Sequence, residues 1–172
     1  MQLDLSRSAL ANATKLYEAG RLHEAERACR DILANTPSDA DALQLLGLIA
    51  GQTGHPDHAL TLLDLAIAQR SDFAAAHANR GIALMALARE DEAVASLRRA
   101  VELRPDHLYS WYALGNALVT TGDPDGAEAA FREALKLNPA FVEARSNLAL
   151  ALQQRGRVDE AIDHFEQALK DG

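Results

Sequence analysis

The chain has 172 residues, 24% charged and 48% hydrophobic, a composition typical of a folded globular protein and not of a disordered one. Its formal net charge of −8, from 25 acidic and 17 basic side chains, repels phosphate backbones and excludes nucleic acid as a favoured partner. One cysteine, no signal-like amino terminus and no apolar stretch near the roughly 20 residues of a membrane span predict a cytoplasmic protein.

An internal repeat of 34 residues runs through the chain. Its clearest column consists of Ala25, Ala59, Ala93, Ala127 and Ala161. A small residue lies five positions before each of these alanines, at Gly20, Gly54, Ala88, Gly122 and Gly156. A proline or serine lies twelve positions after the first four, at Pro37, Ser71, Pro105 and Pro139. A period of this length is the signature of a helical repeat array.

Taken in chain order, the units span 6–39, 40–73, 74–107, 108–141 and 142–172, the last being three residues short. Each unit holds two segments of about 12 to 14 residues with apolar residues at helical spacing, such as Leu114 and Leu118. The glycine between them favours the left-handed conformation that ends a helix. Each unit therefore predicts a helix, a turn and a second helix.

Two further columns predict how the helices pack. Small residues in the first helices are expected to face the alanine column, so that the two helices approach closely: Ala13, Gly47, Gly81, Gly115 and Ala149. Larger residues in the second helices are expected to fill the space between hairpins: Cys29, Leu63, Leu97, Phe131 and Phe165. No hairpin can bury this second column alone, so neighbouring hairpins must share a core.

These columns resemble a known family. The fourth unit carries the pattern of the tetratricopeptide repeat, in Trp111, Leu114, Gly115, Leu118, Gly122, Ala127, Phe131, Ala134 and Pro139. The resemblance covers residues 6–172 and implies an all-α fold, a right-handed superhelical solenoid of five antiparallel helix pairs in a single domain, 1–172. Asn12, His77, Arg80 and Arg145 depart from the family's usual apolar residue or Trp, which predicts local loosening.

The resemblance also implies that the first helices line a concave groove. The family's groove positions fall on Gln44, Leu45, Leu48, Asn79, Ile82, Met85, Tyr109, Tyr112, Asn116 and Asn147. Only Asn79 matches the clamp that some members use for a terminal carboxylate, which disfavours that ligand. Asn79 and Asn147 match the asparagine ladder of O-linked N-acetylglucosamine transferases, so the asparagines either bind a peptide backbone or are solvated. The apolar members either form pockets for a partner or pack between helices.

No catalytic, cofactor or metal site is predicted. Cys29 lies in a core column and is interpreted as a small hydrophobic residue, not a nucleophile. His55 and His58 have no third ligand near them in the repeat register. Acids at the starts of second helices, such as Asp91 and Glu92, suit the helix dipole and do not converge as a carboxylate pair.

Three functions stay open at this point. The first is a noncatalytic scaffold that binds a protein or peptide in the groove. The second is the substrate-docking arm of a longer protein, because the first unit resembles arrays that bacterial proteins fuse to glycosyltransferase or sulfotransferase domains. The third is a homo-oligomer built through the last helix, whose apolar side has no further repeat to cover it. Its candidate residues are Ile162, Phe165 and Leu169.

Overall fold

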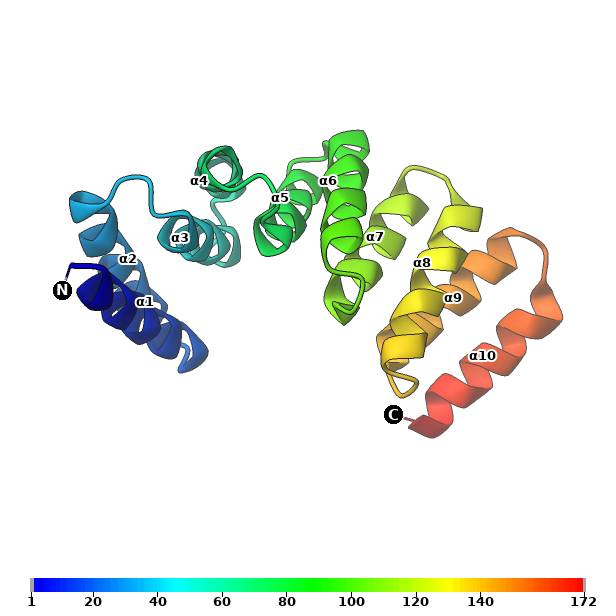
Figure 1. The fold of residues 1–172 in the computed structure, drawn as a ribbon. Coiled ribbons are helices and arrows are strands. Elements are labelled where there is room, and N and C mark those ends of the chain that lie inside the picture. Colours follow the sequence, from blue (N-terminus) through cyan, green and yellow to red (C-terminus); the bar gives the residue numbers. More distant parts are fainter. Residues whose placement is uncertain (1, 172) are drawn as a thin grey trace. The chain divides into compact units, whose positions relative to one another are not determined.

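The computed structural model describes residues 2–171, with side chains described for residues 7–170. Over this part of the chain it contains ten α-helices and no strand, which confirms the all-α prediction (Figure 1). No helix among the described residues is both long and apolar enough to cross a bilayer. The helices are α1 (Gln2–Glu18), α2 (Leu22–Asn35), α3 (Ala40–Gln52), α4 (Pro56–Gln69), α5 (Ala74–Ala86), α6 (Glu90–Leu103), α7 (Leu108–Thr120), α8 (Pro124–Leu137), α9 (Val142–Gln154) and α10 (Val158–Asp171).

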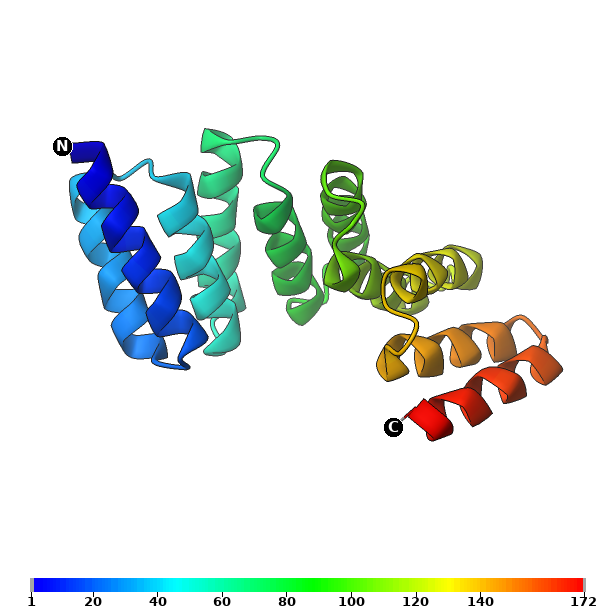
Figure 2. The same ribbon diagram turned by 60° about the horizontal axis from the view of Figure 1, so that its bottom comes forward.

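The helices form two compact units, one up to Leu87 with α1–α5 and one from Ala88 onward with α6–α10. In the first unit α1 packs on α2 and α3 on α4, while α2–α3 and α4–α5 contacts join successive hairpins (Figure 2). In the second unit α7–α8 and α9–α10 are the hairpins, joined through α8 and α9. Each unit thus contains two antiparallel helix pairs and one further helix, α5 in the first unit and α6 in the second. The prediction of one domain over 1–172 stays a prediction.

The turns inside the hairpins use the left-handed backbone conformation that the glycine column predicts. The four glycines at these turns, Gly20, Gly54, Gly122 and Gly156, have φ between +71° and +81°. Ala88 holds the same place in the third repeat with φ of +53°, although it carries a Cβ. An L-residue with a Cβ is strained there by about 1–2 kcal/mol, so the repeat overrides local preference at Ala88.

The small column of the first helices makes room mainly for the large column of the second helices, and at Gly47 it also lies close to the alanine column that the sequence suggested. A Cβ on Gly47 would lie 2.8 Å from the Leu63 Cγ. A Cβ on Gly115 would overlap the Phe131 ring. The alanines still lie in the core, since Ala25, Ala59, Ala93 and Ala127 are fully buried. The prediction of close approach is confirmed, and the large side chains of Leu63 and Phe131 are the nearest partners, with the Ala59 carbonyl 3.4 Å from a Cβ on Gly47.

The large column forms the centre of each unit. Cys29, Leu63, Leu97 and Phe131 are fully buried, whereas Phe165 in α10 is only partly buried. Burial raises the pKa of the Cys29 thiol to about 11, with smaller contributions from the carboxylates of Asp39 and Glu26. A thiol with such a pKa stays protonated near neutral pH, which supports its interpretation as a core residue.

Three residues at one repeat position anchor the preceding loop. The Trp111 Nε1 donates a hydrogen bond to the Pro105 carbonyl at 2.8 Å. At the same position, His77 Nε2 lies 2.9 Å from the carbonyl of Ser71, and Arg145 donates to that of Pro139. A carbonyl only accepts, so His77 Nε2 carries the proton. The loosening predicted at His77 and Arg145 was therefore wrong, because each provides the donor that Trp provides.

Candidate functional site: two first-helix surfaces

A cavity of about 330 Å³ opens between α3, α4 and α5 of the first unit. Gly47 and Gly51 line it from α3, and Gly51 leaves space that the short side chains of Ala59, Ala83 and Ala86 do not fill. Its remaining lining residues are Leu48, Gln52, Pro56, Asn79 and Ile82. The cavity therefore exists because small residues meet where three helices come together. Asn79 and Gln52 bring the only side-chain amides to an otherwise apolar lining.

A second cavity, of about 280 Å³, lies between α1 and α3 of the same unit. It shares Leu48 with the first cavity, and its lining also holds Leu10, Thr14, Tyr17, Glu18, Asp41, Gln44 and Leu45. Asp41 forms an ion pair with Arg70 at 2.6 Å. The Gln52 Nε2 donates to the Tyr17 hydroxyl at 2.6 Å, which links the two helices at one end of this cavity.

The structure brings most of the first-unit candidates together. Gln44, Leu45 and Leu48 line the cavity beside α1, and Leu48 also lines the cavity that contains Asn79 and Ile82. Ile82 is 53% exposed, whereas Leu45 is 6% exposed and serves as a wall. Met85 is half-buried and lines neither cavity. Sequence reasoning placed these residues on one face but did not reveal the cavities.

The corresponding surface of the second unit is occupied by its own side chains. Asn147 on α9 donates to the Asn116 Oδ1 on α7 at 2.7 Å, and its Nδ2 lies 3.4 Å from the Tyr112 hydroxyl. The Tyr112 ring lies 4.9 Å from that of Phe141, centroid to centroid. Tyr109 also contacts Phe141 but remains 64% exposed. The four second-unit candidates thus form a polar and aromatic cluster with Phe141, in which the side chains contact one another.

The predicted self-association face of α10 is largely exposed. Ile162 is 48% and Leu169 83% exposed, while Phe165 is partly buried. Val158, which the sequence analysis did not single out, is 52% exposed. It lies four residues before Ile162 and extends the same helical stripe. Val158, Ile162 and Leu169 are thus exposed apolar side chains at helical spacing along α10, with the partly buried Phe165 between them.

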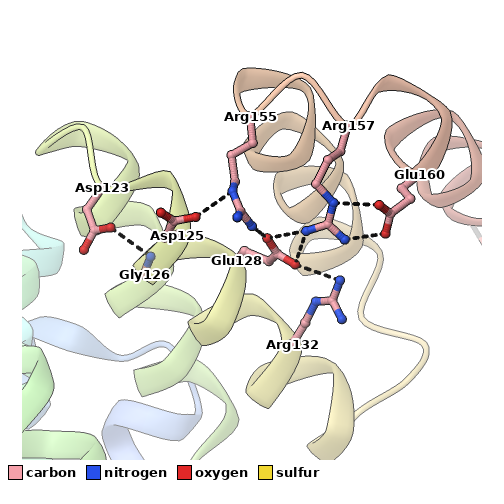
Figure 3. A network of polar contacts seen from close by, with 8 residues as sticks. All are labelled: Asp123, Asp125, Gly126, Glu128, Arg132, Arg155, Arg157 and Glu160. Atoms are coloured by element: carbon pink, nitrogen blue, oxygen red, sulfur yellow. Dashed lines mark hydrogen bonds and ion pairs between the residues drawn. The ribbon is translucent and has the colours of Figure 1, made fainter.

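A charge network that sequence reasoning missed ties α8 to the turn between α9 and α10 (Figure 3). Glu128 is buried, with 7% of its surface exposed, and contacts Arg132 at 2.7 Å and Arg157 at 2.8 Å. Arg155 contacts Glu128 as well, and its Nε lies 2.6 Å from the Asp125 Oδ1. Arg157 also forms an ion pair with Glu160. The only signal for this network in the sequence was a pair of basic residues, Arg155 and Arg157, at a turn where the other repeats have few basic residues.

The described histidines do not form a metal site. Within the part of the chain that the structure describes, no three His, Cys, Asp or Glu side chains gather closely enough to hold a metal ion. The Nδ1 of His55 lies 3.3 Å from the Thr53 hydroxyl at a helix start. His107 Nδ1 lies 2.7 Å from the Ser110 hydroxyl, and burial lowers the pKa of His107. Both contacts are local to helix ends.

Two models of the tetratricopeptide repeat match the sequence. One matches residues 10–54 and 112–172, and the other matches residues 71–140. The chain belongs to the tetratricopeptide repeat family. This agrees with the helix pairs and the 34-residue columns described above, and it identifies the fold as that of a helical-repeat protein-interaction scaffold. No curated protein matches the sequence.

The structure is similar to solved structures of MamA. One crystal structure of MamA has a TM-score of 0.83 at 26% identity, covering 92% of this chain and 93% of that one. A mutant of MamA has a TM-score of 0.81 at 25% identity and covers both chains completely. For MamA from Desulfovibrio magneticus RS-1 the TM-score is 0.83, the identity 19%, and the coverage 96% and 93%, which shows the fold alone. The predicted likeness to arrays of glycosyltransferase and sulfotransferase fusions stays a prediction.

Proposed function

We propose that this protein is a noncatalytic interaction scaffold that holds a peptide segment of a partner against its first helices. The observation that carries this proposal is the apolar cavity between α3, α4 and α5, with the Asn79 amide in its wall. An apolar recess with a few polar groups is the usual form of a recognition site. Membership of the tetratricopeptide repeat family supports the same function.

Site-specific photocrosslinking tests this proposal. A photoreactive amino acid replaces Ile82, which is 53% exposed beside the cavity, or Leu65 on the second helix α4, which is 48% exposed. The two sites are matched in exposure and apolar character, so nonspecific crosslinking is the same at both. We expect a discrete partner band from Ile82 only. Equal crosslinking from Leu65 would contradict binding along the first helices.

A second candidate function is self-association through the α10 stripe of Val158, Ile162, Phe165 and Leu169. It is favoured by the exposure of Leu169, at 83%, since a side chain of this kind is stabilised when a partner covers it. Light scattering over a concentration series tests it with the Ile162→Gln, Leu169→Gln variant. A mass that rises with concentration and returns to that of one chain in the variant supports the candidate, and an unchanged mass contradicts it.

A further inference from the structure

We infer that the partner segment carries an aliphatic side chain that fills the α3–α5 cavity and a basic side chain that pairs with Glu18. This inference rests on the proposed function and names the ligand for the first unit. The two cavities concerned share one wall, Leu48, so a single short peptide can reach both.

The shape of the larger cavity selects an aliphatic side chain. Its volume of about 330 Å³ lies at the lower end of the range of about 300–1,000 Å³ for small-ligand pockets. The lining between Leu48 and Ile82 consists mainly of glycine, alanine and proline, which offer no hydrogen bonds from their side chains. A buried polar group there would lose its water without a replacement. An inserted leucine, isoleucine or valine would not.

Asn79 is positioned to hold the backbone of the same peptide residue. Its side-chain amide has no hydrogen-bond partner among residues 7–170, although it is partly buried beside the cavity. Asn147 holds the same repeat position as Asn79 and donates to Asn116 of the preceding repeat. In the repeat that precedes Asn79, the position equivalent to Asn116 is occupied by Leu48. Leu48 cannot accept a hydrogen bond, so both the donor and the acceptor of Asn79 are available to a peptide backbone.

The charges around the smaller cavity select a basic neighbour. Its two charged lining residues are Glu18 and Asp41, and neither cavity is lined by a lysine or an arginine. Arg70 neutralises Asp41, but Glu18 is exposed and has no ion-pair partner among the described side chains. The net charge of −8 also attracts a basic segment. Neighbouring first helices lie about 10 Å apart, which corresponds to about three residues of extended peptide.

Titration of the ¹⁵N-labelled full chain with synthetic peptides, followed by NMR, tests the inference. The probes are acetylated and amidated glycine peptides in which one leucine and one lysine are separated by one, two or three glycines, in both orders. We expect at least one spacing to shift the amide signals of Gly51, Asn79 and Glu18 saturably at millimolar concentration. Replacing its leucine by glycine should weaken binding about tenfold or more. Replacing its lysine by glutamate should weaken it at least about threefold.

Variants of the protein locate the contacts. Gly51→Met fills the larger cavity and should weaken the best peptide about tenfold, while Gly51→Ala is the control for the change in helix propensity. A Cβ at Gly51 meets only the Ala59 Cβ, at 3.8 Å, so the alanine variant keeps the fold. Glu18→Gln should weaken the lysine peptide about two- to fivefold, and Glu166→Gln on α10 removes the same charge as its control. Circular dichroism checks that each variant is folded.

The outcomes separate this inference from the proposed function. Binding that shifts first-helix signals but is unaffected by Gly51→Met and Glu18→Gln would overturn the inference and leave the scaffold function standing. Failure of every peptide to shift these signals would also overturn it, whatever the crosslinking shows. Only equal crosslinking from Ile82 and Leu65 would remove the scaffold function as well.

Discussion

Each unit has an asparagine at the same position of a first helix, Asn79 in the first unit and Asn147 in the second, but the two side chains differ in their hydrogen bonds. In the second unit Asn147 donates a hydrogen bond to Asn116 and approaches the Tyr112 hydroxyl, so its hydrogen-bond partners come from the same surface. In the first unit Asn79 faces Leu48, stays without a hydrogen-bond partner among the described residues, and lines a cavity. The same residue type at the same position is therefore structural in one unit and available for a ligand in the other. The role of the asparagine depends on whether the preceding repeat offers a hydrogen-bond acceptor, as at Asn116, or an apolar side chain, as at Leu48.

The two units also differ in how charge stabilises them. Glu128 in the second unit is buried among three arginines, whereas its counterpart Glu26 in the first unit is more exposed, with Arg30 at 2.7 Å as its nearest ion-pair partner. Stability of the second unit should thus depend on polar contacts between successive repeats. The first unit should depend mainly on apolar packing around residues such as Leu63 and Ile49.

The largest expected difference concerns these two glutamates. Glu128→Ala should lower the free energy of unfolding by about 2–3 kcal/mol, because Arg155 and Arg157 lose a buried partner while remaining partly solvated. Glu26→Ala should cost only about 0.5 kcal/mol. Urea unfolding followed by circular dichroism measures both, and fluorescence of Trp111, the single tryptophan, reports on the second unit. Equal losses would remove the contrast between the units.

A second pair of substitutions compares two first-helix glycines. Gly115→Ala should destabilise the protein by about 2 kcal/mol, because the added Cβ overlaps the buried Phe131 ring. Gly51→Ala should stabilise it by about 0.5–1 kcal/mol, since alanine favours the helix and its Cβ makes only an ordinary contact, 3.8 Å from the Ala59 Cβ. Thermal and urea unfolding give the sign of each change. A destabilised Gly51→Ala variant would mean that the cavity beside it is smaller than described.

The two asparagines provide the most direct test of the comparison. Asn147→Ala should lower the free energy of unfolding by about 1 kcal/mol through the lost hydrogen bond to Asn116. Asn79→Ala should change it by less than about 0.5 kcal/mol, since no hydrogen bond is lost. The measurement is again urea unfolding of both variants. If Asn79→Ala were the costlier change, Asn79 would have a structural role and the proposed ligand contact would be undermined.

The smallest expected effect is on pH dependence. Burial lowers the pKa of His107 and of His164 below the ordinary value of 6.5, with help from Arg104 near His107 and from Arg145 and Arg132 near His164. The unfolded chain therefore binds more protons at these residues as the pH falls below 6.5, and the second unit loses stability. Unfolding monitored by Trp111 fluorescence from about pH 7.5 to about pH 5 should show this loss. A double substitution of both histidines by glutamine should flatten it.

The sequence predicts the helices well because their causes are local or periodic. The glycine column has the positive φ expected of it, and the large column is buried from Cys29 to Phe131. Even Ala88 adopts the turn conformation, which shows that the repeat as a whole outweighs one residue's preference. The misjudged positions, His77 and Arg145, were those where a different side chain performs the same hydrogen bonding as Trp111.

The sequence by itself determined the repeat length, the helix pairs, the family and the face on which the candidate site lies, because each follows from spacing along one chain. Only the tertiary structure decided that Asn147 donates to Asn116 while Asn79 has no hydrogen-bond partner among the described residues. It also decided that Gly51 has room for a small side chain and Gly47 does not, and that Glu128 pairs with three arginines. These outcomes depend on which side chains of neighbouring repeats meet. That pairing is a matter of packing in three dimensions, which a repeat column does not record.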